Sequence, residues 1–261
     1  MNMKKLAPTL LAILLLAGAV LAVHFFQKNS SSEKPAASGA SQTASDQLVN
    51  TPAGEESQAE QPPGGQIVLE GEMRAVWVPY LSLDQSKIGQ GQEAFQKAFD
   101  EIVSQAKEYG LNTLIVHVRP FGDAMYPSEI YPWSHLLTGT QGGDPGFDPL
   151  EYMVRKTHEA GMQFHAWLNP LRIQSKGTPS ILAPDHLYTQ WREDSDPNND
   201  DWVVDWEEGK YFNPAYPEVR EKIIEGIREI VENYPVDAIH FDDYFYPTSD
   251  GAFDEKAYQA Y

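Results

Sequence analysis

The chain has 261 residues, which is enough for one large domain or two small ones. Its formal net charge of -19 at pH 7 excludes a general nucleic-acid-binding protein, because phosphate recognition needs a basic surface. The chain has no cysteine, which excludes disulfides, thiolate zinc sites and cysteine nucleophiles. Its six Trp and thirteen Tyr are mostly expected in the core, although aromatic residues also suit surfaces on which sugar rings stack.

Residues 1–27 have the pattern of an export signal. Lys4 and Lys5 precede an apolar run that extends from Leu6 to Phe26. A run of about 20 apolar residues can span a bilayer as a helix, and the small residues at 17–19 would also admit a signal peptidase. An uncleaved membrane anchor and a cleavable signal both fit. In either case the lysines predict that the remainder is extracytoplasmic, anchored to the membrane or secreted into the cell envelope.

Residues 28–66 have a different composition, rich in Ser, Ala, Gln, Glu, Pro and Gly. The segment has almost no bulky apolar residue, so burial cannot offset the entropy of ordering it. We predict a disordered linker here, followed by a folded domain over residues 67–261. Such a tether would hold a catalytic domain near a membrane.

The folded region alternates short apolar strands with amphipathic helices. The predicted strands cover residues 74–80, 113–118, 163–168 and 238–241, and the predicted helices cover residues 92–109, 149–161 and 217–234. The second helix starts with a capping box and a proline at its first position, in Asp148-Pro149-Leu150-Glu151. Because each helix is followed by a buried strand, the pattern predicts an α/β fold with a parallel sheet.

Two arrangements of this sheet fit the pattern: an open doubly wound sheet and a (β/α)8 barrel. A doubly wound sheet usually has a glycine-rich loop after its first strand, and residues 78–82 contain no glycine. The loops over residues 119–148 and 169–216 are long and rich in Trp, Tyr, Asp and Pro, and barrel enzymes build their sites from such loops. We therefore predict the N-terminal half of a TIM barrel with four βα units, truncated at its C-terminus inside a further helix near residues 253–258.

Polar side chains occupy the C-terminal ends of three of these strands. They are His117 and Arg119, then His165, Trp167 and Asn169, and finally His240, Asp242 and Asp243. Residues two apart on a strand share a face, which pairs His117 with Arg119 and His240 with Asp242. A charge buried without a partner is very costly, so these residues indicate a functional site.

Asp242 is the best catalytic candidate. Asp243 is the second candidate, although it would point the other way or cap the next turn. We expect Arg119 to form an ion pair that orients a carboxylate. Asp123 and Tyr126, in the loop after the second strand, fit either substrate contacts or contacts that fix the loop.

A histidine on a buried strand is more often a hydrogen-bonded packing residue than a reactive one. We expect a packing role for His117. Packing and functional roles both fit His165 and His240, because each lies two residues from another polar group.

The acidic run from Glu193 to Glu208 follows Trp191 and contains Trp202 and Trp206. The simpler interpretation is a solvated loop, and the alternative is a lid whose tryptophans stack on sugar rings. The run lacks the regular aspartate spacing of a calcium loop. A cation site built from its carboxylates is an alternative with only a weak signal, and we predict no metal and no cofactor.

Four segments carry a more specific signal, and together they resemble one family. They are residues 113–120 (TLIVHVRP), 147–150 (FDPL), 165–170 (HAWLNP) and 240–247 (HFDDYFYP). They resemble glycoside-hydrolase-like family 10, a group of bacterial envelope proteins with TIM-barrel domains distantly related to the alpha-amylase clan, over residues 72–261. The resemblance implies hydrolysis of glycosidic bonds, with peptidoglycan glycan strands as the substrate class.

In the alpha-amylase clan, the nucleophilic aspartate ends the fourth strand and stands two residues after an inward arginine. The resemblance places Asp242 at that position, with His240 in place of the arginine. A hydrogen bond from His240 or Arg119 would stabilise the ionised form of Asp242. The clan's general acid follows the fifth strand, which would lie beyond Tyr261, so we expect the chain alone to be inactive.

Side chains near the same strand ends would bind the polysaccharide substrate. We expect this of Arg119, Asp123, Tyr126, His165, Trp167, Asn169, His240 and Tyr244. Two other functions fit these residues. In a metal-dependent polysaccharide deacetylase, His165, His240 and Asp242 would bind zinc, although no His-x-x-x-His motif supports it. The same barrel mouth could also bind glycan without cleaving it.

Overall fold

The structure is a computed structural model that describes residues 65–67, 69, 71–242, 247–248 and 250–260. The predicted export signal lies outside the described residues, and so does the predicted linker apart from residues 65 and 66. Asp243 and Tyr244 also lie outside them. Within the described part of the chain, no helix combines the length and the apolar character needed to cross a membrane.

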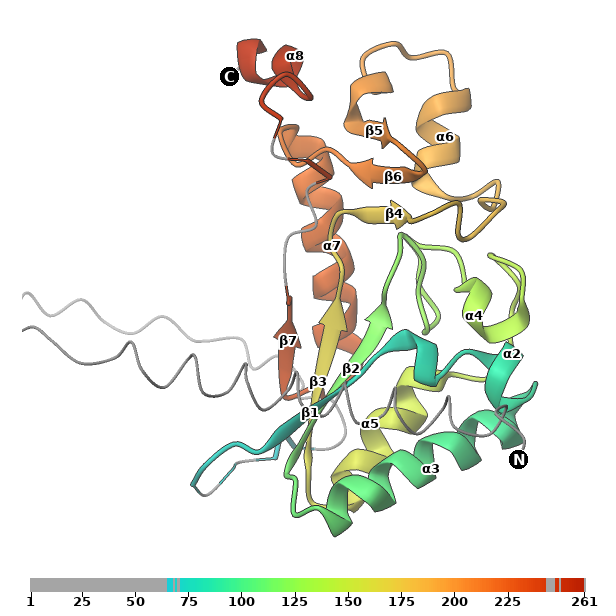
Figure 1. Cartoon of the computed structure of the whole chain (residues 1–261), viewed down its shortest axis with the longest axis vertical. Helices are drawn as coiled ribbons and strands as arrows, with labels where there is room; N and C mark the ends of the chain where they lie inside the picture. Colours follow the sequence, from blue (N-terminus) through green and yellow to red (C-terminus); the bar gives the residue numbers. More distant parts are fainter. Residues whose placement is uncertain (1–64, 68, 70, 243–246, 249, 261) are drawn as a thin grey trace, which may run out of the picture. The chain divides into compact units, whose positions relative to one another are not determined.

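The main sheet has four parallel strands, ordered as they occur in the chain (Figure 1). They are β1 (Ala75–Val78), β2 (Thr113–Arg119), β3 (Gln163–Leu168) and β7 (Ala238–His240). Parallel neighbours need crossover connections, and these contain α3 (Gln92–Glu108), α5 (Pro149–Glu159) and α7 (Pro217–Asn233). The prediction of an α/β fold with a parallel sheet is therefore confirmed.

One face of this sheet packs against the helices. The buried residues of α3 follow the helical period, and they are Phe95, Phe99, Val103 and Ala106. They belong to one core with the alternate strand residues Leu114, Val116, Phe164 and Ala166. Because side chains alternate across a strand, the residues between these four face the opposite side of the sheet.

Helix α5 begins as its sequence predicts. The Asp148 carboxylate accepts a hydrogen bond from the backbone N–H of Glu151, 3.0 Å away, and Pro149 occupies the first turn. The second carboxylate oxygen of Asp148 accepts a hydrogen bond from the Tyr234 hydroxyl at 2.7 Å. Since Tyr234 follows α7, this contact ties the start of one crossover helix to the end of the next.

The long connection from β3 to α7 contains an antiparallel sheet that the sequence did not predict. Its strands are β4 (Arg172–Gln174), β6 (Gly209–Phe212) and β5 (Val203–Trp206), in that order, and the connection also holds α6 (Leu187–Glu193) and the 3-10 turn η3 (Asp200–Trp202). Figure 1 shows this small sheet beyond the C-terminal ends of β2 and β3. The remaining short elements are the 3-10 turn η2 (Tyr80–Ser82), α2 (Gln85–Ile88), α4 (His135–Thr138) and α8 (Glu255–Ala260).

The acidic run 193–208 is an exposed loop only in its first half, because its second half forms η3 and β5. The three tryptophans in and before the run each make an edge-on aromatic contact. The Trp191 ring is buried and meets Trp202 edge-on, with 5.1 Å between centroids, and Trp206 packs edge-on against Phe253 at 4.9 Å. The prediction of a solvated loop is therefore wrong for residues 200–206, while residues 194–198 are exposed as predicted.

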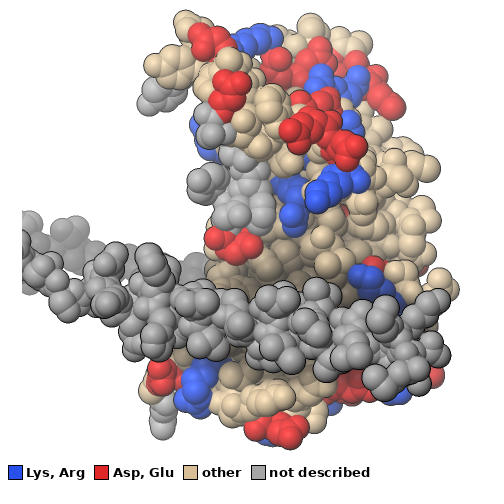
Figure 2. All heavy atoms as spheres, viewed as in Figure 1, with Lys and Arg blue, Asp and Glu red and all other residues tan. Residues whose placement is uncertain are grey.

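Charged side chains form ion pairs on the exposed side of the small sheet. The Asp205 carboxylate accepts from Lys210 at 2.6 Å and from Arg192 at 3.3 Å, and the Tyr188 hydroxyl donates to it at 3.0 Å. Figure 2 shows acidic and basic side chains interspersed over this part of the surface. Exposed pairs of this kind contribute little to stability individually, at about 0–1 kcal/mol each.

Candidate active site

Three aromatic side chains form a row across the C-terminal half of the main sheet. His117 on β2 pairs with Trp167 on β3, and Trp167 pairs with His240 on β7. The row lies on the side opposite the helices, which we call the polar face. His165 lies on the same face, two residues before Trp167, as the strand alternation predicts.

Asp242 follows the end of β7 and meets this row. Its side chain is exposed, and its Oδ1 accepts a hydrogen bond from the indole Nε1–H of Trp167 at 2.9 Å. The prediction of Asp242 beside His240 on one face is consistent with this geometry, because Trp167 also meets the His240 ring edge-on at 6.1 Å. The expected donor was wrong, since the hydrogen bond comes from Trp167 and neither from His240 nor from Arg119.

Trp167 is held by a flat stack on His117. The two ring centroids lie 3.4 Å apart with an angle of 9° between the ring planes. His117 is 2% exposed, and the Tyr80 ring meets it edge-on at 5.5 Å. Burial lowers the pKa of His117 to about 3, so its imidazole is neutral near pH 7. His117 therefore packs as expected, although among the described residues neither of its ring nitrogens has a hydrogen-bond partner.

Trp77 belongs to the same face, and the sequence did not single it out. It pairs with Ile115, which in turn pairs with His165, and 57% of its surface is exposed. Its Nε1–H donates to Nε2 of His240 at 3.1 Å. Since that nitrogen accepts, a neutral His240 carries its proton on Nδ1. The alternation of side chains along β1 puts Trp77 on this face. Its neighbours in the sequence are apolar, so nothing there indicated a site.

Arg119 does not share a face with His117, and the predicted pairing is wrong. The register of β2 against β3 shifts between the two residues, so that His117 pairs with Trp167 while Arg119 pairs with Leu168. The extra residue of such a bulge reverses the side on which the next side chain lies. Arg119 is fully buried, with its guanidinium carbon 4.4 Å above the Tyr131 ring.

The contacts of Tyr131 show on which side Arg119 lies. The Tyr131 hydroxyl donates to the backbone carbonyl of Lys222 on α7 at 3.3 Å, and its ring packs beside Gly226. Arg119 therefore lies on the helix side of the sheet. It cannot hold Asp242 or a sugar on the polar face without leaving this position.

Asp123 and Tyr126 are also buried away from the row. The Asp123 carboxylate accepts from the Nδ1–H of His135 at 3.2 Å and from the Gln141 amide at 3.0 Å, and it is fully buried. Tyr126 is 1% exposed and packs edge-on against Tyr234, and burial raises the pKa of its hydroxyl. Of their two expected roles, the geometry favours fixing the loop rather than contacting substrate.

Asn169 and His165 occupy the ends of the candidate site along β3. The Asn169 amide donates to the backbone carbonyl of Pro120 at 3.0 Å, which ties the end of β3 to the end of β2. His165 is half-buried, and burial lowers its pKa. Its Nε2 atom lies 3.1 Å from Oε1 of Gln163. Their expected contacts with substrate stay predictions.

Arg172 is a second residue that sequence reasoning missed. It lies on β4, its Nε donates to the carbonyl of Pro120 at 3.0 Å, and its guanidinium lies over the Phe121 ring. Its charge contributes to the low pKa of His117, after burial, while Asn169, Asp242 and His240 also act on that ring. No motif marked Arg172, because the small antiparallel sheet that places it here was not predicted.

Comparison with known families now decides where the chain belongs. The model of the family described as glycosyl hydrolase-like 10 matches residues 72–261. The chain belongs to this family.

Two curated relatives of this family member match over most of its length. Glycosyl hydrolase YngK of Bacillus subtilis (strain 168) is 40% identical over 179 residues, covering 67% of this chain and 34% of that protein. Glycosyl hydrolase DigH of Escherichia coli (strain K12) is 34% identical over 235 residues, covering 84% of this chain and 52% of that protein. The chain thus spans about a third to a half of the length of these relatives.

Solved structures give weaker likenesses. The noncanonic maltogenic alpha-amylase AmyB from Thermotoga neapolitana has a TM-score of 0.41 with 16% identity, over 72% of this chain and 42% of that one.

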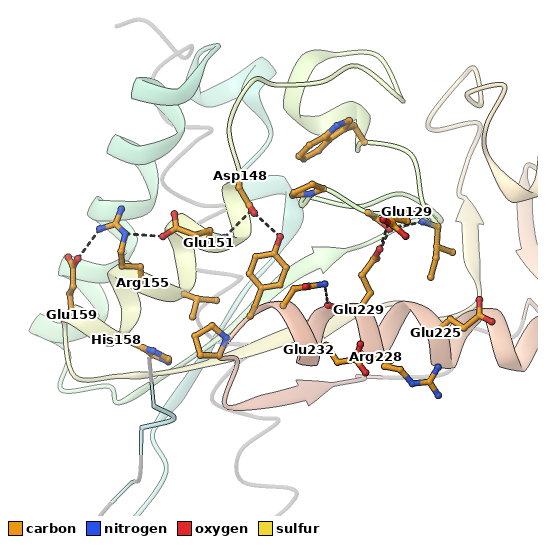
Figure 3. A pocket seen from close by; sticks show the side chains of 18 residues that line it. Glu129, Asp148, Glu151, Arg155, His158, Glu159, Glu225, Arg228, Glu229 and Glu232 are labelled. Carbon is orange, nitrogen blue, oxygen red and sulfur yellow. Dashed lines mark hydrogen bonds and ion pairs between the residues drawn. The ribbon is translucent and has the colours of Figure 1, made fainter. Parts of the chain in front are cut away.

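The family domain also contains a large groove on its helix side (Figure 3). It has a volume of about 1150 Å³ and is lined by α5, α7, residues 127–130 and Trp133. Carboxylates from both helices line it, and they are Glu151, Glu159, Glu225, Glu229 and Glu232. None of the row residues lines this groove. In parallel sheets of this class, sites form at the C-terminal strand ends, so we assign the candidate site to the polar face.

The residues proposed for a zinc site do not converge in this family domain. Among the described residues, no three His, Asp or Glu side chains are grouped so that they could hold a metal. The Nε2 atom of His240 faces Trp77, and Oδ1 of Asp242 faces Trp167. The geometry therefore gives the deacetylase interpretation no support.

Proposed function

We propose that this family member is an exported glycoside hydrolase that acts on cell-envelope polysaccharide, with Asp242 as a catalytic carboxylate. Peptidoglycan glycan strands are the substrate that we favour. One observation carries the proposal: an exposed carboxylate accepts a hydrogen bond from a buried indole at the C-terminal end of a parallel sheet, beside a row of aromatic side chains. In this proposal the sheet is one half of a (β/α)8 barrel, whose sites lie at that end.

The chemistry assigned to Asp242 follows from the needs of glycosidic cleavage. Such cleavage uses two carboxyl groups, one to protonate the leaving oxygen and one to support or attack the oxocarbenium-like centre. An exposed aspartate that accepts an N–H hydrogen bond is suited to the second role, because the bond orients its carboxylate. We assign Asp242 to this second role, and Asp243 stays the second candidate.

The character of the surrounding face supports a neutral polysaccharide as substrate. The row itself is aromatic, and neither Trp167 nor the neutral His117 adds charge to it. The net charge of -19 disfavours polyanions such as nucleic acids. Export is supported by Lys4, Lys5 and the apolar run at 6–26, which would place the domain among envelope polysaccharides.

Replacement of Asp242 tests the proposed function in the full-length protein. We expect Asp242→Asn to keep the thermal unfolding midpoint and the binding of purified glycan strands. Turnover of those strands should fall by about three orders of magnitude or more, as losses of a catalytic carboxylate do. The matched control is Asp100→Asn on α3, where the carboxylate accepts from the Tyr152 hydroxyl on the helix side, and it should retain turnover.

The same assay separates the alternatives. Wild-type turnover in Asp242→Asn would exclude the catalytic role. Activity that is lost in a strong chelator would favour the metal-dependent deacetylase instead. Binding without any product from the wild-type protein would favour a glycan-binding barrel.

A further inference from the structure

Asp242 needs an external constraint to hold one orientation. It lies after the last residue of β7, its side chain is exposed, and an exposed aspartate samples several rotamers. Among the described residues, its side chain accepts one hydrogen bond, which comes from the Trp167 indole at 2.9 Å. The orientation of Asp242 therefore depends on where that indole lies.

The indole of Trp167 is itself tightly constrained. It is 8% exposed, it lies flat on His117 with 3.4 Å between ring centroids, and the His240 ring meets it at 88°. A rotation that moved its N–H away from Asp242 would have to break the flat stack. A close aromatic contact contributes about 0.5–1.5 kcal/mol beyond the area that it buries, so the stack holds the donor in place.

The flat stack also depends on the state and position of His117. Its ring is buried between Trp167 and Tyr80, and burial keeps the imidazole neutral. The side chains of Asn169 and Arg172 lie close enough to act on the His117 ring, and both donate a hydrogen bond to the carbonyl of Pro120. The His117 ring therefore has little freedom to move. Through the flat stack, it restricts the movement of the Trp167 ring as well.

We propose that Trp167 is the positioning residue for Asp242 and that His117 acts as the clamp that fixes Trp167. This inference rests on the proposed catalytic role of Asp242. The donor is a neutral N–H on a rigid ring, so it orients the carboxylate before substrate binds, and such preorganisation lowers the barrier without changing ground-state binding.

The substitution Trp167→Phe tests the donor. Phenylalanine retains a flat face for His117 but has no N–H for Asp242. We expect kcat on glycan strands to fall about 10- to 100-fold, the loss typical of a small misplacement of a reacting group, with KM changed less than about twofold. The matched control is Trp133→Phe, a half-buried tryptophan that lines the helix-side groove, and it should keep the wild-type kcat.

Two substitutions of His117 test the clamp. His117→Ala removes the stacked ring, and we expect kcat to fall to the level of Trp167→Phe. His117→Phe restores a flat ring and should recover most of that loss. Because both residues act through one contact, the double variant His117→Ala with Trp167→Phe should be no slower than Trp167→Phe alone.

A measurement without substrate separates this inference from the proposed function. In ¹H–¹⁵N spectra of the chain, the indole N–H signal of Trp167 should shift in Asp242→Ala, while the signal of Trp133 stays in place. If Asp242→Asn turns over glycan normally, the proposed function fails. If Asp242→Asn is inactive but Trp167→Phe keeps the wild-type kcat, or the Trp167 signal is unmoved in Asp242→Ala, only the positioning role is overturned.

Discussion

His117 and His186 are held neutral inside the domain, and this lowers the free energy of unfolding at low pH. His186 is fully buried at the start of α6, where its Nδ1 accepts from the backbone N–H of Tyr188 at 2.9 Å. Burial is the largest cause of both shifts, and it lowers the pKa of His117 to about 3 and that of His186 to about 4. Protonation of either ring would place a charge in the interior.

The direction of the resulting pH dependence follows from proton binding. In the unfolded chain a histidine titrates near 6.5, so between pH 6.5 and about 3 the unfolded state binds the extra proton and the folded state does not. The free energy of unfolding contributed by His117 is therefore fully present above pH 6.5 and falls as the pH is lowered. We expect about 2–3 kcal/mol to be lost from this group between pH 7.5 and 4.5.

Urea unfolding at several pH values checks this prediction. His117→Phe has no group to protonate, so its stability should fall less steeply over the same range than that of the wild type. An identical pH dependence in the two proteins would show that His117 is not the buried neutral group described above.

At the same scale, the side chains that could be predicted were those that follow strict alternation. His165, Trp167, His240 and Asp242 share one face because nothing disturbs β3 and β7. Arg119 could not be placed, since a one-residue bulge in β2 has no marker in the sequence and reverses the face.

At the scale of elements, α7 contains Gly226, whose lack of a side chain leaves space for the Tyr131 ring. Gly226 lies in the interior of a helix, where alanine is normally more stable by about 1 kcal/mol. A Cβ atom at this position would lie 2.5 Å from Cε2 of Tyr131. The ring of Tyr131 is held beneath Arg119 and hydrogen-bonded to α7, so it cannot easily withdraw.

We therefore expect Gly226→Ala to destabilise the fold instead of stabilising it. Overpacking of this kind costs about 1–3 kcal/mol, which exceeds the gain in helix propensity. Thermal or urea unfolding measures the change directly. In a Tyr131→Leu background the clash is relieved, and Gly226→Ala should there be neutral or stabilising; an equal loss in both backgrounds would contradict the argument.

The helices and parallel strands could be predicted because their apolar periods are long and clear. The helices α3, α5 and α7 start where caps, proline or apolar spacing indicate. The antiparallel sheet could not be predicted, since its strands span only three or four residues and one of them follows an acidic run. Because this sheet was not predicted, Arg172 on β4 was not identified as a residue near the candidate site.

At the scale of the whole domain, the two faces of the main sheet carry different kinds of residue. The helix face holds the core and the buried Arg119, and the polar face presents the row that ends at Asp242. The small antiparallel sheet lies beyond the strand ends, on the side of the candidate site (Figure 1). This arrangement is why a site at the strand ends was foreseeable even though the residues that border it were not.

Mass analysis of the products from peptide-free glycan strands tests the central claim most directly. The full-length protein should release shorter strands, each cleavage adding one water and one new reducing end, and Asp242→Asn should release none. Strands of unchanged length that lose only acetyl groups, or that are bound and recovered intact, would contradict glycosidic hydrolysis at this site.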